Sequence, residues 1–217
     1  SRCAGGMTGG TAVVLRSFVD PLTPMEPAMP IPPLLVEPNH VLMTGENPFV
    51  RLAPEDSDDY TTMVSFWRMT FCPAGPGHAL FAKSELTKDR WRIYSDNPAM
   101  TRWLQQTIQG MLTPALKDES TAIIDATFQK SGDPLKSYRE TIRAGSDEIV
   151  CSWSNMRDPI MLHTQPGTPD GRPYGLCTVF VPALEATFSI NGQKALGKAW
   201  PRTREGRPFS TSSLAFS

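Results

Sequence analysis

Apolar and polar residues alternate most clearly across residues 184–200, on either side of Asn191-Gly192. Asn and Gly tolerate positive φ, so this pair predicts a two-residue type I′ turn between the two strands of a β-hairpin. The register of that turn brings large groups opposite small ones on one face, in the pairs Ile190–Gln193, Phe188–Ala195, Ala186–Gly197 and Leu184–Ala199. The other face is mostly polar and pairs Glu185 with Lys198. We therefore expect an antiparallel sheet with one buried face.

Short segments rich in β-branched and aromatic residues, divided by turn residues, predict further strands. They cover residues 62–71, 79–83, 91–94, 121–129, 137–143, 148–155, 160–164, 174–181 and 209–216. Segment 165–173 is too rich in Pro and Gly for a regular element, and we expect it to form a loop that shapes the mouth of a pocket. The succession of short strands predicts a meander, without the alternation of strand and helix that a βαβ fold requires.

One segment has the period of an α-helix. Asp96 or Asn97 can cap its start, Pro98 suits its first turn, and apolar residues recur on one face from Met100 to Leu112. Because a residue before proline disfavours helical backbone, the helix should end just before Pro114. The sequence predicts one helix, at about residues 98–113, that packs its apolar face on the sheet.

Proline recurs in the first 54 residues too often for a helix or a central strand. The same region carries apolar residues, among them Ile31, Leu34 and Val36. We expect an extended arm docked on its own domain or on a second subunit; the alternative is a disordered tail. The predicted organisation is a Pro-rich N-terminal arm at residues 1–55 and a single antiparallel β-barrel-like domain at residues 56–217.

These elements predict a mostly β (α+β) fold, which is an antiparallel barrel or curved sheet with one packed helix and the N-terminal arm. The strand number and the single helix resemble the calycin or lipocalin-like plan. The resemblance is one of architecture, because the chain has no clear GxW near its first strand. It implies a barrel of roughly eight strands that can hold one small ligand.

Composition excludes several partners. The net charge of -1 gives no basic footprint for nucleic acid or for an anionic membrane. No apolar run approaches the roughly 18 residues that span a bilayer. We expect a cytoplasmic protein with neither nucleic acid nor membrane as a partner.

Motifs for cofactors and metals are also missing from the sequence. The four cysteines are widely spaced, with no CxxC pair and no cluster of histidines beside them, so no zinc site is indicated. The chain has no GxxxxGK[ST], GxGxxG, HExxH or GxSxG motif. Chemistry without a cofactor, or simple binding, is the expectation.

Three residues are candidates for acid–base chemistry. His163 lies in a predicted strand near Asp158, and an imidazole beside a carboxylate can act as a general base near neutral pH. The alternative is an exposed strand histidine with no catalytic part. Asp125 interrupts an apolar strand, so it points either into a polar cavity or, if Phe128 faces the core, into water.

Aromatic and arginine residues are candidates for ligand binding. Trp67, Trp153 and Tyr94 fall in or near predicted strands, where they either line an apolar cavity or simply fill a core. Arg92 and Arg157 could orient an acid or carbonyl group of a ligand.

Three functions remain open on these observations. The first is a cofactor-independent enzyme that binds a small, partly apolar organic molecule and acts by proton transfer, as an isomerase, dehydratase or lyase. The second is a non-catalytic carrier or sensor of a similar ligand. The third is a structural assembly subunit, a homo-oligomer whose contacts run through the N-terminal arm.

Overall fold

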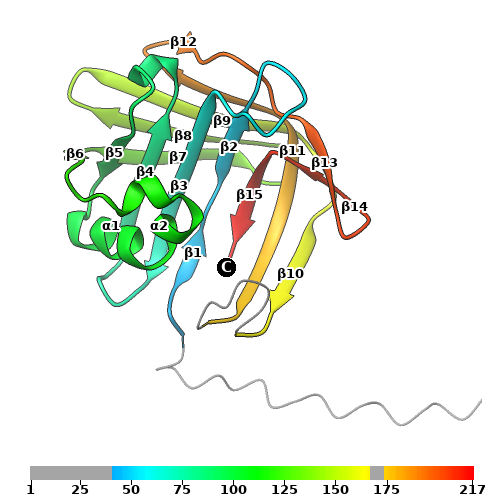
Figure 1. Ribbon diagram of the computed structural model, residues 1–217, viewed down its shortest axis with the longest axis horizontal. Helices are drawn as coiled ribbons and strands as arrows, with labels where there is room; N and C mark the ends of the chain where they lie inside the picture. Colours follow the sequence, from blue (N-terminus) through cyan, green and yellow to red (C-terminus); the bar gives the residue numbers. More distant parts are fainter. Residues whose placement is uncertain (1–40, 167–173) are drawn as a thin grey trace, which may run out of the picture. The chain divides into compact units, whose positions relative to one another are not determined.

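The computed structural model describes residues 41–166 and 174–217. These residues form a curved, largely antiparallel sheet with one helical segment on its outer face, which confirms the mostly β expectation (Figure 1). Most of the predicted arm, residues 1–40, and most of the predicted loop, residues 167–173, lie outside the described residues.

Most of the strands overlap the predicted segments. In chain order they are β1 (Thr44–Glu46), β2 (Phe49–Leu52), β3 (Thr62–Phe71), β4 (Gly77–Lys83), β5 (Arg92–Ser95), β6 (Ile123–Asp125), β7 (Thr127–Asp133), β8 (Ser137–Ala144), β9 (Asp147–Met156), β10 (Ile160–Thr164), β11 (Leu176–Ile190), β12 (Gln193–Lys194), β13 (Pro201–Arg204), β14 (Arg207–Ser210) and β15 (Ser212–Phe216). Strands β3 and β10 have the predicted bounds. The predicted strand at 121–129 is instead two strands, β6 and β7, that meet at Ala126.

The main sheet runs in the order β6-β5-β4-β3-β1-β15-β11-β9-β8-β7. Strand β2 pairs with β3 and β15, while β10 and β12 pair with β11; only β5 and β6 are parallel. Strands β13 and β14 form a separate hairpin. The strands at the two ends of this order, β6 and β7, are separated in the chain by Ala126 alone.

The sheet begins inside the stretch that the sequence analysis assigned to the arm. Strands β1 and β2 lie in residues 44–52 and pair with β3 and β15. The segment Phe49–Leu52 alternates in burial, with Val50 and Leu52 buried, as expected of a strand with one face on the core. Proline density over the preceding residues hid this short alternation.

The predicted hairpin turn is confirmed. Asn191 and Gly192 have φ of 51° and 80°, and Ile190 lies opposite Gln193. Strand β12 nevertheless ends at Lys194, so the predicted pairs Ala186–Gly197, Leu184–Ala199 and Glu185–Lys198 do not form. The return arm instead turns at Gly197 and bridges Ala53 through Lys198.

The helix begins and ends as predicted. The Asn97 side chain accepts a hydrogen bond from the Met100 N–H at 3.1 Å, and Pro98 opens the first turn. Helix α1 (Pro98–Leu104) continues through a π-helical segment (Gln105–Gln109) into α2 (Gly110–Leu112), before Pro114. No helix in the described part of the chain is long and apolar enough to cross a membrane.

Alternate residues of β3 serve two different cores. Val64 and Phe66 point into the concave side of the sheet, where they join a cluster that includes Trp153 and Phe188. Trp67 lies on the convex side and packs in a second cluster with the helix residues Met100, Leu104 and Ile108. The helix therefore covers the outer face of the sheet, and the inner face is filled by side chains of its own strands.

Candidate functional site: an outer groove

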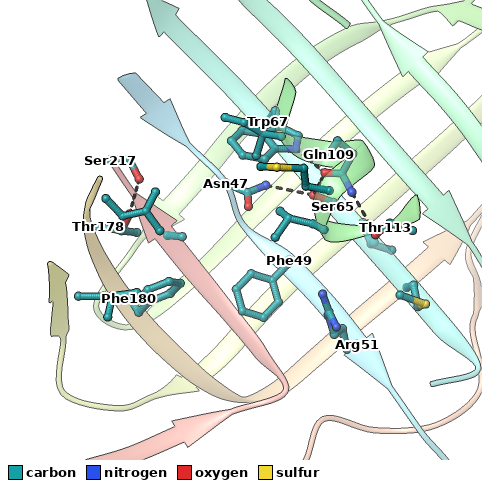
Figure 2. A pocket seen from close by; sticks show the side chains of 18 of the residues that line it. Asn47, Phe49, Arg51, Ser65, Trp67, Gln109, Thr113, Thr178, Phe180 and Ser217 are labelled. Atoms are coloured by element: carbon teal, nitrogen blue, oxygen red, sulfur yellow. Dashed lines mark hydrogen bonds between the residues drawn. The ribbon is translucent and has the colours of Figure 1, made fainter. Parts of the chain in front are cut away.

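A pocket of about 320 Å³ lies on the outer face of the sheet. Its walls come from β2, β3, β11, β15, the end of the helix and the β13–β14 hairpin (Figure 2). A ligand was expected inside the curved sheet, but this pocket lies on the opposite face. Every second side chain of β2 and β3 points outward, so these strands contribute side chains to the outer face as well as to the inner core.

Most of the pocket lining is apolar. Aromatic and aliphatic side chains contribute from several elements, among them Phe49, Met63, Trp67, Trp91, Ile108, Leu162, Phe180 and Phe209. Two further lining residues, Met111 and Leu112, are 44% and 54% exposed. A binding site for a small molecule is typically a concave, mostly apolar space of about 300–1,000 Å³, and this pocket lies near the lower end.

The polar part of the floor is built around Gln109. Its Oε1 accepts hydrogen bonds from Ser65 Oγ and from Trp67 Nε1, both at 2.8 Å. Asn47 donates to Ser65 Oγ at 3.1 Å and to the Phe66 carbonyl (Figure 2). Gln109 is almost completely buried, so these bonds hold its amide in one orientation. The amide nitrogen has a single long contact of 3.4 Å to Thr113 Oγ1, which leaves it able to donate to a ligand.

Two arginines, Arg51 and Arg204, add positive charge to the lining. The Arg51 guanidinium lies 5.9 Å from the ring centre of Phe49. The Arg204 guanidinium lies 5.5 Å from the ring centre of Phe180. Within residues 41–166 and 174–217, neither guanidinium forms an ion pair or a hydrogen bond with another side chain. Stacking on aromatic rings holds an arginine in place while its N–H groups stay available.

Asp58, whose pKa the charge of Arg51 helps to lower, is engaged by two other side chains. Asp58 accepts a hydrogen bond from Tyr60 at 2.8 Å, and Arg202 lies 3.4 Å from the same carboxylate. The hydrogen bonds from Tyr60 and Arg202 lower the pKa of Asp58, with a smaller contribution from the charge of Arg51. Asp58 therefore stays ionised without forming an ion pair with Arg51.

The groove is poor in groups for acid–base chemistry. Among the residues that the structure describes, its lining includes no Asp, Glu, His or Cys. Among residues 41–166 and 174–217, no three such side chains are grouped so that they could hold a metal ion. The chemistry that this site offers is apolar contact, hydrogen bonding from amides and hydroxyls, and attraction of a negative charge.

The predicted catalytic residues do not come together at this groove. His163 and Asp158 are exposed, and their side chains form no hydrogen bond or ion pair with each other. Asp125 is also exposed, while Phe128 packs against the inner core. The Asp125 side chain therefore faces water and not a polar cavity. Arg157 is exposed on the loop after β9.

Of the predicted binding residues, only Trp67 lines the groove. Trp153 and Tyr94 are buried in the inner core, where the Trp153 indole donates to the Phe49 carbonyl at 2.9 Å. The Tyr94 hydroxyl is buried and has no hydrogen-bond partner in the described part of the chain. Arg92 lies 4.0 Å from the Asp147 carboxylate. For Trp153 and Tyr94, core filling is therefore the interpretation that the structure supports.

Sequence reasoning missed Arg51, Arg204 and Gln109. The alternation over Phe49–Leu52 already places Arg51 beside an aromatic residue on an outward face, and this signal was available once the segment was recognised as a strand. Arg204 and Gln109 carry no comparable signal, because only the folded chain brings β13 and the helix to the same part of β2 and β3.

Comparisons with protein-family models, with curated proteins and with solved structures gave no match.

Proposed function

We propose that this protein binds a small organic anion, with a mostly apolar body and one acidic group, and that it acts as a carrier or sensor without transforming the ligand. The observation that carries the proposal is the combination in one groove of apolar walls with two arginines that lie over aromatic rings and form no ion pair with any described residue. An anionic group of a ligand would form that ion pair.

The described lining of the groove holds no carboxylate or imidazole, which favours a carrier over an enzyme. A proton-transfer enzyme needs a titratable group within hydrogen-bond reach of its substrate. None of the predicted acid–base residues lines the groove, namely Asp125, Asp158 and His163. A closed calycin-like barrel, homo-oligomers formed through the N-terminal arm and a cytoplasmic location stay predictions.

Octanoate and octan-1-ol are matched probes of the proposal, because they share an apolar chain and differ in head-group charge. Calorimetric titration should give octanoate a dissociation constant at least about tenfold lower, since a hydrogen bond to a charged group contributes about 1.5–3 kcal/mol. Arg51→Gln and Arg204→Gln should each weaken octanoate binding about five- to tenfold, with little effect on octan-1-ol.

Arg139→Gln is the matched control, because Arg139 is exposed on β8 and does not line the groove. It should leave the affinity for both probes unchanged. Equal affinities for the acid and the alcohol, or equal losses in Arg139→Gln and Arg51→Gln, would contradict the proposal.

A further inference from the structure

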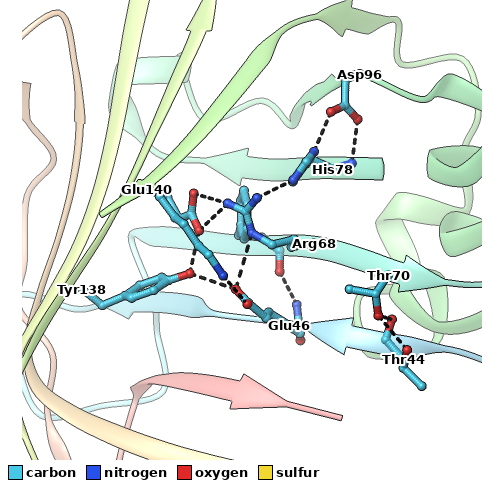
Figure 3. A network of polar contacts seen from close by, with 11 residues as sticks. Thr44, Glu46, Arg68, Thr70, His78, Asp96, Tyr138 and Glu140 are labelled. Atoms are coloured by element: carbon cyan, nitrogen blue, oxygen red, sulfur yellow. Dashed lines mark hydrogen bonds and ion pairs between the residues drawn. The ribbon is translucent and has the colours of Figure 1, made fainter. Parts of the chain in front are cut away.

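A chain of ionisable side chains crosses the inner side of the sheet, on the face away from the groove. It runs from Asp96 through His78, Arg68, Glu140 and Tyr138, and it continues to Glu46 and Lys130 (Figure 3). The Glu140 side chain is completely buried. The contacts join β1, β3 and β4 to β7 and β8, which are distant in the order of the sheet.

Arg68 fixes the hydrogen-bond roles in the first half of this series of side chains, from Asp96 to Glu140. Arg68 can only donate, so its contact of 2.5 Å with His78 Nε2 makes that nitrogen an acceptor. The proton of a neutral His78 ring is then on Nδ1, from which it is donated to Asp96 at 2.5 Å. Arg68 Nη2 also donates to both oxygens of Glu140 at 2.8 Å.

The second half of this series, from Glu140 to Glu46, lacks one proton if both glutamates are ionised. Tyr138 Oη lies 2.8 Å from Glu46 Oε2 and 2.8 Å from Glu140 Oε1. A phenol has one proton, and an ionised carboxylate can only accept. With both glutamates ionised, one of these short contacts would join two oxygens with no hydrogen between them.

We infer that the folded protein binds one additional proton at this site at neutral pH, held by Glu140 and donated to Tyr138, whose own proton is donated to Glu46. Both short contacts are then hydrogen bonds. Glu46 is the ionised member, because Lys130 donates to its other oxygen at 2.8 Å. With His78 neutral, the charges of Arg68 and Lys130 then balance those of Glu46 and Asp96.

The surroundings of the two carboxyl groups agree with this assignment. Burial raises the pKa of Glu140 and outweighs the opposing effects of Arg68 and of the hydrogen bond with Tyr138, and the charge of Glu46 raises this pKa further. For Glu46, the hydrogen bonds from Lys130 and Tyr138 outweigh burial and lower the pKa. On the neighbouring strands, Lys130 of β7 and Cys151 of β9 lie opposite Glu140, and burial raises the pKa of the Cys151 thiol, so this thiol adds no charge.

A bound proton links folding to pH in a defined direction. Because the folded state raises the pKa of Glu140, its contribution to stability is complete below the ordinary pKa of glutamate. It is lost as pH rises through the raised value, and the folding equilibrium constant falls by up to about tenfold per pH unit in that window. Deprotonation leaves two carboxylates facing one phenol proton, where Tyr138 of β8 contacts Glu46 of β1.

Infrared spectroscopy tests the proposal, since a protonated carboxyl absorbs apart from a carboxylate. Glu140 is the only buried acidic residue in the described part of the chain. We expect a protonated-carboxyl band at neutral pH in the wild type and in Glu185→Gln, an exposed control on β11, and its absence in Glu140→Gln. A folded wild type without this band at neutral pH overturns the proposal, whatever the stability of the variants.

Stability measurements give a second test. The amide of Glu140→Gln can donate to Tyr138 and accept from Arg68, as the protonated acid does, so its folding constant at neutral pH should stay within about threefold of the wild-type value. Its stability should also lose the fall with rising pH described above, which Glu185→Gln should keep. A loss of a hundredfold or more in Glu140→Gln alone would show that Arg68 requires a carboxylate, which contradicts the inference.

Discussion

Neighbouring residues of this chain serve different sites because side chains alternate across each strand. Trp67 faces the groove while Arg68 belongs to the inner polar chain, and Asn47 and Glu46 divide in the same way. A substitution at one position therefore tests one site without touching the other. Gln109 shows how closely the floor of the groove depends on single atoms, since one amide oxygen accepts two hydrogen bonds.

Gln109→Leu should lower the free energy of unfolding by about 2–4 kcal/mol, because it leaves the hydroxyl of Ser65 and the indole N–H of Trp67 without their acceptor. Gln106→Leu is the control, since Gln106 is exposed on the same helical segment, and its effect should stay within about 0.5 kcal/mol. Urea denaturation measures both. Similar losses in the two variants would show that the Gln109 amide does not hold the floor.

At the scale of elements, the hairpin shows where local sequence decides structure and where it does not. The turn at Asn191-Gly192 follows from the φ angles that these residues tolerate, and the turn and first pairs are as predicted. The return arm leaves β11 after a few residues and bridges Ala53 through Lys198. Such a contact with a distant segment has no local signal.

Two glycines near this hairpin should differ in their tolerance of alanine. Gly192→Ala places a Cβ in open space and should cost roughly 1–2 kcal/mol, for the positive φ alone. Gly197→Ala also brings its Cβ to 3.0 Å from the Ala53 backbone, so it should cost at least about 1 kcal/mol more. Chemical denaturation measures the free energy of unfolding of both variants. Equal losses of this free energy would mean that the contact with Ala53 is not tight.

At the scale of the whole molecule, most strands and the helix were predictable because their signals are periodic and local. Strand β3 and the helix cap at Asn97 are examples. The groove was not predictable, because Arg51, Gln109 and Arg204 come from three separate elements that only tertiary packing brings together. The inner series of ionisable side chains was not predictable for the same reason, since Arg68 and Glu140 pair across strands that are not neighbours in the sheet.

The most direct test of ligand binding in the outer groove uses the indole N–H signals of tryptophan in a nitrogen-15 NMR titration with octanoate. Trp67 and Trp91 line the groove, whereas Trp153 lies in the inner core. We expect the signals of Trp67 and Trp91 to shift with increasing octanoate, and that of Trp153 to stay in place. Shifts at Trp153 without shifts at Trp67 would place the ligand inside the sheet and contradict the account, as would a titration in which no indole signal moves.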